Sequence, residues 1–167
     1  MAEQNSPLGG FRFPEGPVTI AEIPFLTQIN IRKEPDSSLP LSAGTSSRSG
    51  DVDILWLGPD EWLAVGPPGG FTEHHWEGSV VDVSAQRTTI SLRGPHVRDL
   101  LALGCATDLH PGVFGVGACV QTTLAHAPVI ILRRESEFWV LVRASFATHL
   151  AGWLVDASRE FAVEALP

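Results

Sequence analysis

Hydrophobic and polar residues alternate in several short runs along the chain, and these runs predict β-strands. In residues 27–33 the apolar Ile29 and Ile31 alternate with polar neighbours, as in a half-buried strand. Residues 53–66 hold two apolar segments separated by Gly-Pro-Asp-Glu, which predicts a hairpin because proline presets the dihedral angle of a tight turn. Further strands are predicted at residues 80–83, 88–92, 119–126, 129–134 and 138–143.

Two segments change from strand-like alternation to helical spacing. Pro95 fits the first position of a helix, where its missing N–H costs nothing, and apolar residues recur at helical spacing until Gly104. A second helix is predicted to be capped by Ser145. One apolar stripe runs along this second helix and is expected to pack on a sheet; it comprises Phe146, Leu150, Trp153, Leu154, Ala157 and Phe161.

Groups of strands joined by short turns, with a helix after each group, predict an α+β fold. We expect helices packed on antiparallel or mixed sheets rather than a doubly wound parallel sheet. The chain has 167 residues, enough for one sizeable core, so residues 17–167 are expected to form a single domain. Residues 1–16 are rich in Gly and Pro and are predicted to be a flexible arm, and residues 34–50, rich in Ser, Pro and Gly, are predicted to be a surface loop.

Composition and charge narrow the class of partner. The chain has 11 Lys and Arg against 19 Asp and Glu, a net charge of -8, which argues against nucleic acid as a partner. Its apolar residues are dispersed, with no run that predicts a membrane span, and the N-terminus lacks the features of a secretory signal, so we expect a cytoplasmic protein. Cys105 and Cys119 lack a metal-type spacing and are expected to be buried structural thiols.

No catalytic constellation is visible in the chain. Its six histidines are scattered, without HExxH or acid–histidine pairing at ligand spacing, and neither a GxSxG motif nor a phosphate-binding glycine loop is present. The pairs Asp51 with Asp53 and Asp60 with Glu61 are expected in loops and turns, as solvated charge. Asp82, at the end of an apolar strand, is either a buried catalytic carboxylate or an acceptor for backbone N–H groups of the next turn, and we prefer the second reading.

Three segments together resemble the gamma subunit family of heterotetrameric sarcosine oxidases. They are DILWLGPDEWLAVG, VDVSAQRTTISLRGPHVRDLLALGCATDLHPGVFGVGACVQT and FWVLVRASFATHLAGWLVDA, and the resemblance covers roughly the last two thirds of the chain. Within them, LGPDEWL and DVSxQRT are fairly specific when taken together. More distantly, the order of segments resembles the folate-binding domains of the aminomethyltransferase, or glycine-cleavage T-protein, family.

The resemblance implies a complex of four different subunits that oxidises sarcosine to glycine. Tetrahydrofolate would accept the one-carbon unit, and oxygen would yield hydrogen peroxide. FAD, FMN and NAD are implied in the larger subunits, alpha and beta, and zinc in the smallest, delta. This chain would be the small non-catalytic subunit that supports the others, with no cofactor of its own and an aminomethyltransferase-like fold containing ferredoxin-like ββαβ elements.

The chain departs from the folate-dependent members of the wider family in one hairpin. Those members carry one or two aspartates there, after a Gly-rich turn, whereas the matching residues 123–134, TLAHAPVIILRR, contain no acid. Ala127 or Pro128 cannot replace a carboxylate that holds a pterin ring or a cationic centre, so we do not expect folate to bind this chain alone. A stand-alone folate-binding or aminomethyltransferase-type protein and a homo-oligomeric binding module remain as alternatives.

A run rich in polar residues, Asp82 to Thr88, begins at the end of the predicted strand at residues 80–83 and is the candidate contact with a partner subunit. It keeps the strand end of the family while the neighbouring hairpin lacks the catalytic acid, so we interpret it as structural. We also predict that Asp82, Ser84, Gln86 and Arg87 form a docking edge for a partner subunit. No catalytic, cofactor-binding or metal-binding residue is assigned.

Overall fold

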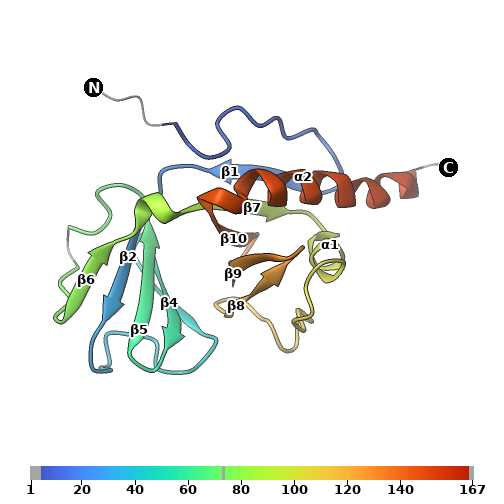
Figure 1. Cartoon of the computed structure of the whole chain (residues 1–167). Helices are drawn as coiled ribbons and strands as arrows, with labels where there is room; N and C mark the ends of the chain where they lie inside the picture. Colours follow the sequence, from blue (N-terminus) through green and yellow to red (C-terminus); the bar gives the residue numbers. More distant parts are fainter. Residues whose placement is uncertain (1–4, 73, 166–167) are drawn as a thin grey trace.

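The computed structural model describes residues 5–72 and 74–165, and two five-stranded sheets dominate it (Figure 1). Sheet A has the spatial order β1 (Thr19–Ile23), β7 (Arg87–Arg93), β10 (Phe138–Arg143), β9 (Ala127–Arg133) and β8 (Cys119–Leu124). Sheet B has the order β3 (Ser46–Ser49), β4 (Val52–Gly58), β5 (Glu61–Gly66), β2 (Thr27–Arg32) and β6 (Ser79–Asp82). All neighbouring strands pair antiparallel, which confirms the predicted α+β class with antiparallel sheets.

Two α-helices accompany sheet A. α1 (Val97–Ala102) follows β7, and α2 (Ala147–Ser158) follows β10 and extends across that side of the molecule in Figure 1. Short 3-10 helices lie at η1 (Ser84–Gln86), η2 (Ala144–Phe146) and η3 (Arg159–Ala165).

Both helix starts differ from the sequence prediction. α1 begins at Val97, and Pro95 lies in the turn before it. α2 begins at Ala147 because η2 occupies the preceding turn, so Ser145 is not its cap. The predicted apolar stripe is buried at Leu150 and Leu154, whereas other members are only partly covered. Phe146 is 38% exposed.

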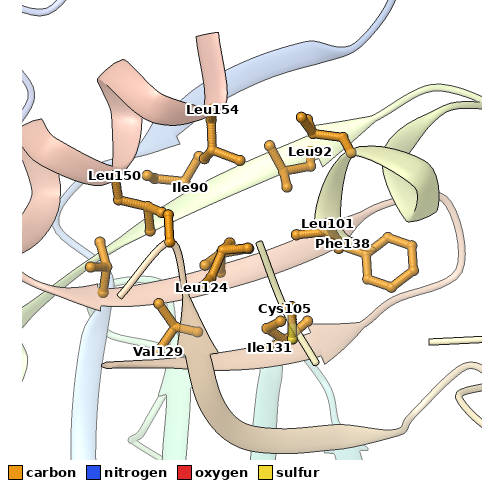
Figure 2. Close-up of a cluster of buried hydrophobic side chains, with 14 of the residues drawn as sticks. Ile90, Leu92, Leu101, Cys105, Leu124, Val129, Ile131, Phe138, Leu150 and Leu154 are labelled. Atoms are coloured by element: carbon orange, nitrogen blue, oxygen red, sulfur yellow. The ribbon is translucent and has the colours of Figure 1, made fainter. Parts of the chain in front are cut away.

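Alternation of side chains buries sheet A on both faces. On β10, Val140 faces the helices, while Trp139 and Leu141 face sheet B. Figure 2 shows the helix side, where Leu150 and Leu154 of α2 lie over the apolar side chains of the sheet. The opposite side joins Leu55, Leu63 and Val65 of sheet B to sheet A. Sheet A is therefore the central layer, covered by helices on one face and by sheet B on the other.

The outer face of sheet B is covered by loops. Trp62 is fully buried there, and its indole Nε1 donates a hydrogen bond of 2.8 Å to the carbonyl of Pro40 in the loop before β3. The same cluster is closed by Phe71 and Trp76. The loop between β2 and β3 therefore covers the apolar cluster around Trp62.

The predicted loop at residues 34–50 is wrong for its last part. Ser46–Ser49 form β3, which pairs with β4 at the edge of sheet B. Three of these four side chains are exposed and none is apolar, so the strand leaves no hydrophobic alternation in the sequence. The rest of the interval contains no other strand.

The described part of the N-terminal segment packs against the core. Leu8 is 3% exposed, and the Oγ of Ser6 donates a hydrogen bond of 2.6 Å to Glu22 on β1. The predicted flexibility of residues 1–16 concerns motion and stays a prediction; residues 1–4 lie outside the described residues.

Two further sequence expectations concern thiols and membranes. Cys105 and Cys119 are free and buried, as predicted. Among residues 5–72 and 74–165, no helix is long and apolar enough to cross a membrane.

Candidate partner interface

The predicted docking edge is the segment in which the chain passes from sheet B to sheet A, and we call residues 82–87 the crossing segment. Asp82 ends β6, η1 follows, and Arg87 opens β7. Figure 1 shows this passage between β6 and β7. The four predicted residues are therefore brought together at the junction of the two sheets.

Asp82 is exposed, which contradicts the idea of a buried carboxylate and leaves the acceptor reading. Its Oδ1 accepts hydrogen bonds from the hydroxyl of Ser84 at 2.6 Å and from the Ser84 backbone N–H at 2.8 Å. These bonds, the hydroxyl first, hold the pKa of Asp82 below its ordinary value. Asp82 is thus the acceptor that shapes the turn after β6.

Gln28 on β2 fastens the crossing segment to sheet B. Its backbone N–H donates to the Oγ of Ser84 at 2.9 Å, and its side-chain Nε2 donates to the carbonyl of Arg87 at 3.2 Å. Gln28 is 1% exposed. The role of Gln28 was not predictable from the sequence, because it depends on pairing between segments that are distant in the chain. A single polar residue in an alternating strand gives no signal for it.

The polar groups of the crossing segment therefore fall into two sets. Those of Asp82 and Ser84 are used within the chain. Gln86 is exposed, and no hydrogen bond of its side chain is present among the described residues. Arg87 is half-buried, and burial, followed by repulsion from Arg143, lowers the pKa of its guanidinium. Gln86 and Arg87 are the two members of the predicted edge that remain available to a partner.

The crossing segment lines an open hollow of about 920 Å³. Its other walls come from the turn between β1 and β2, including Phe25 and Leu26, and from Pro7 and Pro68. Two other depressions on the described surface are smaller, with volumes of about 410 and 220 Å³. The hollow at the crossing segment combines apolar and polar walls, as the surface of a protein–protein contact does.

Phe25 has an unusual backbone conformation for a large side chain. Its φ is 59°, in the left-handed region, while its side chain is 50% exposed beside the hollow. A turn that places proline before a left-handed residue ordinarily has glycine in that second place, and here Pro24 precedes Phe25. Phe25 was not among the predicted site residues, although the Pro-Phe pair just before the predicted strand at residues 27–33 was an available signal.

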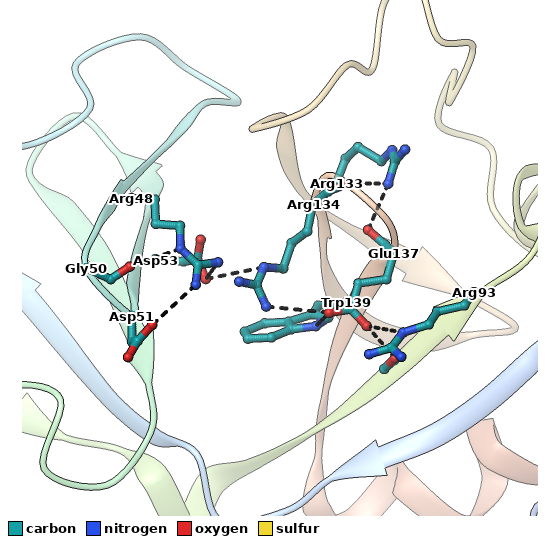
Figure 3. A network of polar contacts seen from close by, with 10 residues as sticks. Arg48, Gly50, Asp51, Asp53, Arg93, Arg133, Arg134, Glu137 and Trp139 are labelled. Atoms are coloured by element: carbon teal, nitrogen blue, oxygen red, sulfur yellow. Dashed lines mark hydrogen bonds and ion pairs between the residues drawn. The ribbon is translucent and has the colours of Figure 1, made fainter.

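A second polar cluster lies between the two sheets and corrects the prediction for Asp53 (Figure 3). Asp53 lies in β4 and is 5% exposed, rather than a solvated loop residue. Its Oδ2 lies 3.7 Å from Nη1 of Arg48 and 3.6 Å from Nε of Arg134. Burial raises the pKa of Asp53 to about 6, against the opposing effect of Arg48. Asp51, by contrast, is exposed as predicted.

Glu137 completes this cluster from sheet A. Its carboxylate accepts hydrogen bonds from Ser91 at 2.7 Å, from Arg93 at 2.8 Å and from the indole of Trp139 at 2.9 Å. Burial alone would raise the pKa of Glu137, but these hydrogen bonds together lower it. The guanidinium of Arg134 also lies over the ring of Trp139, 4.0 Å from its centroid. The cluster is a polar cross-link between the sheets.

The β8–β9 hairpin contains no acidic side chain. Its turn residues Ala125 and His126 both have positive φ, and Ala127 is fully buried at the start of β9. No residue of this hairpin can supply a carboxylate that would hold a pterin ring. Within residues 5–72 and 74–165, no three His, Cys, Asp or Glu side chains are grouped to hold a metal ion.

Comparison with known sequences gives one consistent family. The profile described as "Sarcosine oxidase, gamma subunit family" matches residues 31–160. Sarcosine oxidase subunit gamma of Corynebacterium sp. (strain P-1) is 38% identical over 170 residues, covering 89% of this chain and 84% of the relative. The protein of the same name from Arthrobacter sp. is 38% identical over 168 residues, covering 88% and 83%.

Solved structures agree with the sequence comparison. A chain of the heterotetrameric sarcosine oxidase from Corynebacterium sp. U-96, solved in complex with pyrrole 2-carboxylate, matches with a TM-score of 0.81 and 31% identity, over 95% of this chain and 96% of that one. The glycine cleavage system aminomethyltransferase T from Bartonella henselae matches with a TM-score of 0.60 and 14% identity, over 84% of this chain and 46% of that one. The second match shows a shared fold.

Proposed function

The chain belongs to the sarcosine oxidase gamma subunit family, and we propose that it is the small non-catalytic assembly subunit of a heterotetrameric sarcosine oxidase. The observation that carries the proposal is the match to one chain of such a heterotetramer over 95% of its length.

The acidic side chains of the crossing segment and of the inter-sheet cluster are bound within this chain, which supports a structural role. The polar groups of Asp82 and Ser84 are used in shaping the turn, and the β8–β9 hairpin has no carboxylate for a pterin. The acids of the inter-sheet cluster, Asp53 and Glu137, bind arginines of the same chain. Asp82, Asp53 and Glu137 therefore have structural roles within this chain.

The reaction chemistry is proposed to reside in the other subunits. In this account the larger subunits, alpha and beta, carry FAD, FMN and NAD and oxidise sarcosine to glycine, with tetrahydrofolate as the one-carbon acceptor. The small delta subunit holds zinc. The complex is proposed to be cytoplasmic.

The crossing segment is proposed to contact a larger subunit. Asp82 and Ser84 fix its shape, while Gln86 and Arg87 present polar groups that a partner can bind. Phe25 adds an exposed aromatic ring to the same hollow. Arginine and aromatic side chains are enriched in protein–protein contacts, so this composition suits a docking surface.

A pull-down tests the proposal. The tagged chain is purified from extract of its native cells, the flavin absorbance of the eluate is recorded, and sarcosine-dependent peroxide formation is measured. We expect flavin-bearing partners and peroxide formation. A colourless eluate without partners, together with binding of tetrahydrofolate to the isolated chain in a titration, would instead support the stand-alone folate-binding alternative.

A further inference from the structure

Two arginines lie directly opposite each other where β7 begins and β10 ends. Arg143 pairs with Arg87 in the antiparallel register. Because directly opposed residues of neighbouring strands project from the same face of a sheet, their side chains lie side by side. Like charges in this position destabilise a sheet, so the pair is a cost to the isolated chain.

No acidic side chain among the described residues forms an ion pair with either arginine. Neither arginine has an ion pair within 4.0 Å or a side-chain hydrogen bond in the described part of the chain, although the whole chain carries a net charge of -8. Glu61 is the acid that exerts an attraction on Arg87. Its carboxylate is already bound by Asn30 at 2.8 Å and by Arg32 at 2.8 Å.

Arg87 is also partly removed from water. It is half-buried at the wall of the open hollow. A charged group that is removed from water normally has a charged or hydrogen-bonding partner, because without one the free-energy cost of its desolvation is not offset. The open side of the hollow gives a partner group access to it, and Phe25 supplies an apolar contact at the same place.

We propose that Arg87 and Arg143 bind a carboxylate side chain of a partner subunit, and that this contact offsets their mutual repulsion on assembly. The inference rests on the proposed function and names the partner chemistry at the crossing segment. Two adjacent guanidinium groups offer parallel N–H donors, which match the two oxygens of a carboxylate. A partner aspartate or glutamate is therefore the group that fits, with Phe25 packing beside it.

The test uses the subcomplex of the other three subunits, immobilised, and measures its affinity for the added chain at several salt concentrations. Arg87→Gln and Arg143→Gln are each expected to weaken binding by about tenfold or more and to reduce its dependence on salt. Arg159→Gln is the matched control, since Arg159 is 73% exposed and pairs locally with Asp156; this variant should bind like the unchanged chain.

The outcomes separate the two proposals. If the unchanged chain does not bind the subcomplex, the proposed function fails. If it binds and both arginine variants bind equally well with the same salt dependence, the carboxylate site is wrong. The unfolding midpoint of the isolated variants gives a further readout: Arg143→Gln should keep or raise it, because the variant removes a repulsion, and a marked fall would show that Arg143 stabilises the fold itself.

Discussion

The guanidinium of Arg134 joins the two sheets through Asp53: its Nε lies 3.6 Å from the Oδ2 of that carboxylate. Asp53 belongs to β4 of sheet B, whereas Arg134 directly follows β9 of sheet A. The two sheets also share an apolar cluster, whose side chains set no register by themselves. This ion pair is therefore a directional link within a largely apolar layer.

Removal of the Arg134 guanidinium should destabilise the chain. Arg134→Ala leaves the buried Asp53 with fewer cationic neighbours and uncovers Trp139, so we expect a loss of about 3 kcal/mol in the free energy of unfolding. Urea unfolding of the isolated chain measures it. Arg159→Ala, which removes an exposed pair, should cost less than about 1 kcal/mol. Equal effects of the two substitutions would contradict the cross-link.

Asp53 should make stability depend on pH. Its pKa is about 6 in the folded chain against an ordinary value of 3.8, so the folded state binds the proton more tightly. The tighter proton binding contributes about 3 kcal/mol to the free energy of unfolding. This contribution is complete below pH 3.8 and is lost as the pH rises to about 6. Asp53→Asn should flatten this part of the profile and be more stable than the unchanged chain at pH 7. Thermal unfolding from pH 4 to 8 compares the two proteins, and parallel profiles would show that Asp53 does not titrate in this range.

Part of this architecture is visible in the sequence, and part depends on contacts between distant segments. The β4–β5 hairpin was predictable because its turn residues and apolar runs are local signals. The burial of Asp53 was not, since it depends on Arg134 from the other sheet. The opposition of Arg87 and Arg143 follows from strand register, which local pattern does not fix.

Ser84 should be needed for the shape of the crossing segment. Ser84→Ala removes the acceptor of the Gln28 backbone N–H and one donor to Asp82, so we expect a loss of about 1–3 kcal/mol in the free energy of unfolding. Ser49→Ala, at an exposed position of β3, is the matched control and should change stability by less than about 0.5 kcal/mol. Denaturant unfolding of both variants decides, and an unchanged Ser84→Ala protein would remove this residue from the account.

Phe25 should destabilise the isolated chain but strengthen its binding to the other subunits. A left-handed conformation costs a large residue about 1–2 kcal/mol, and asparagine tolerates it better. Phe25→Asn should therefore keep the thermal midpoint of the isolated chain or raise it, while binding to the other subunits weakens. Val113→Asn removes another exposed apolar side chain, 68% exposed and distant from the hollow in sequence, and should leave binding unchanged. Retained affinity of Phe25→Asn would exclude the ring from the interface.

The most direct test of the account is native mass spectrometry of the complex purified through a tag on this chain. We predict a single assembly that contains one copy of the chain with three different partner chains. After the partner chains are dissociated, this chain should carry no flavin. A spectrum with only the free chain, or only copies of it bound to one another, would contradict the assembly role.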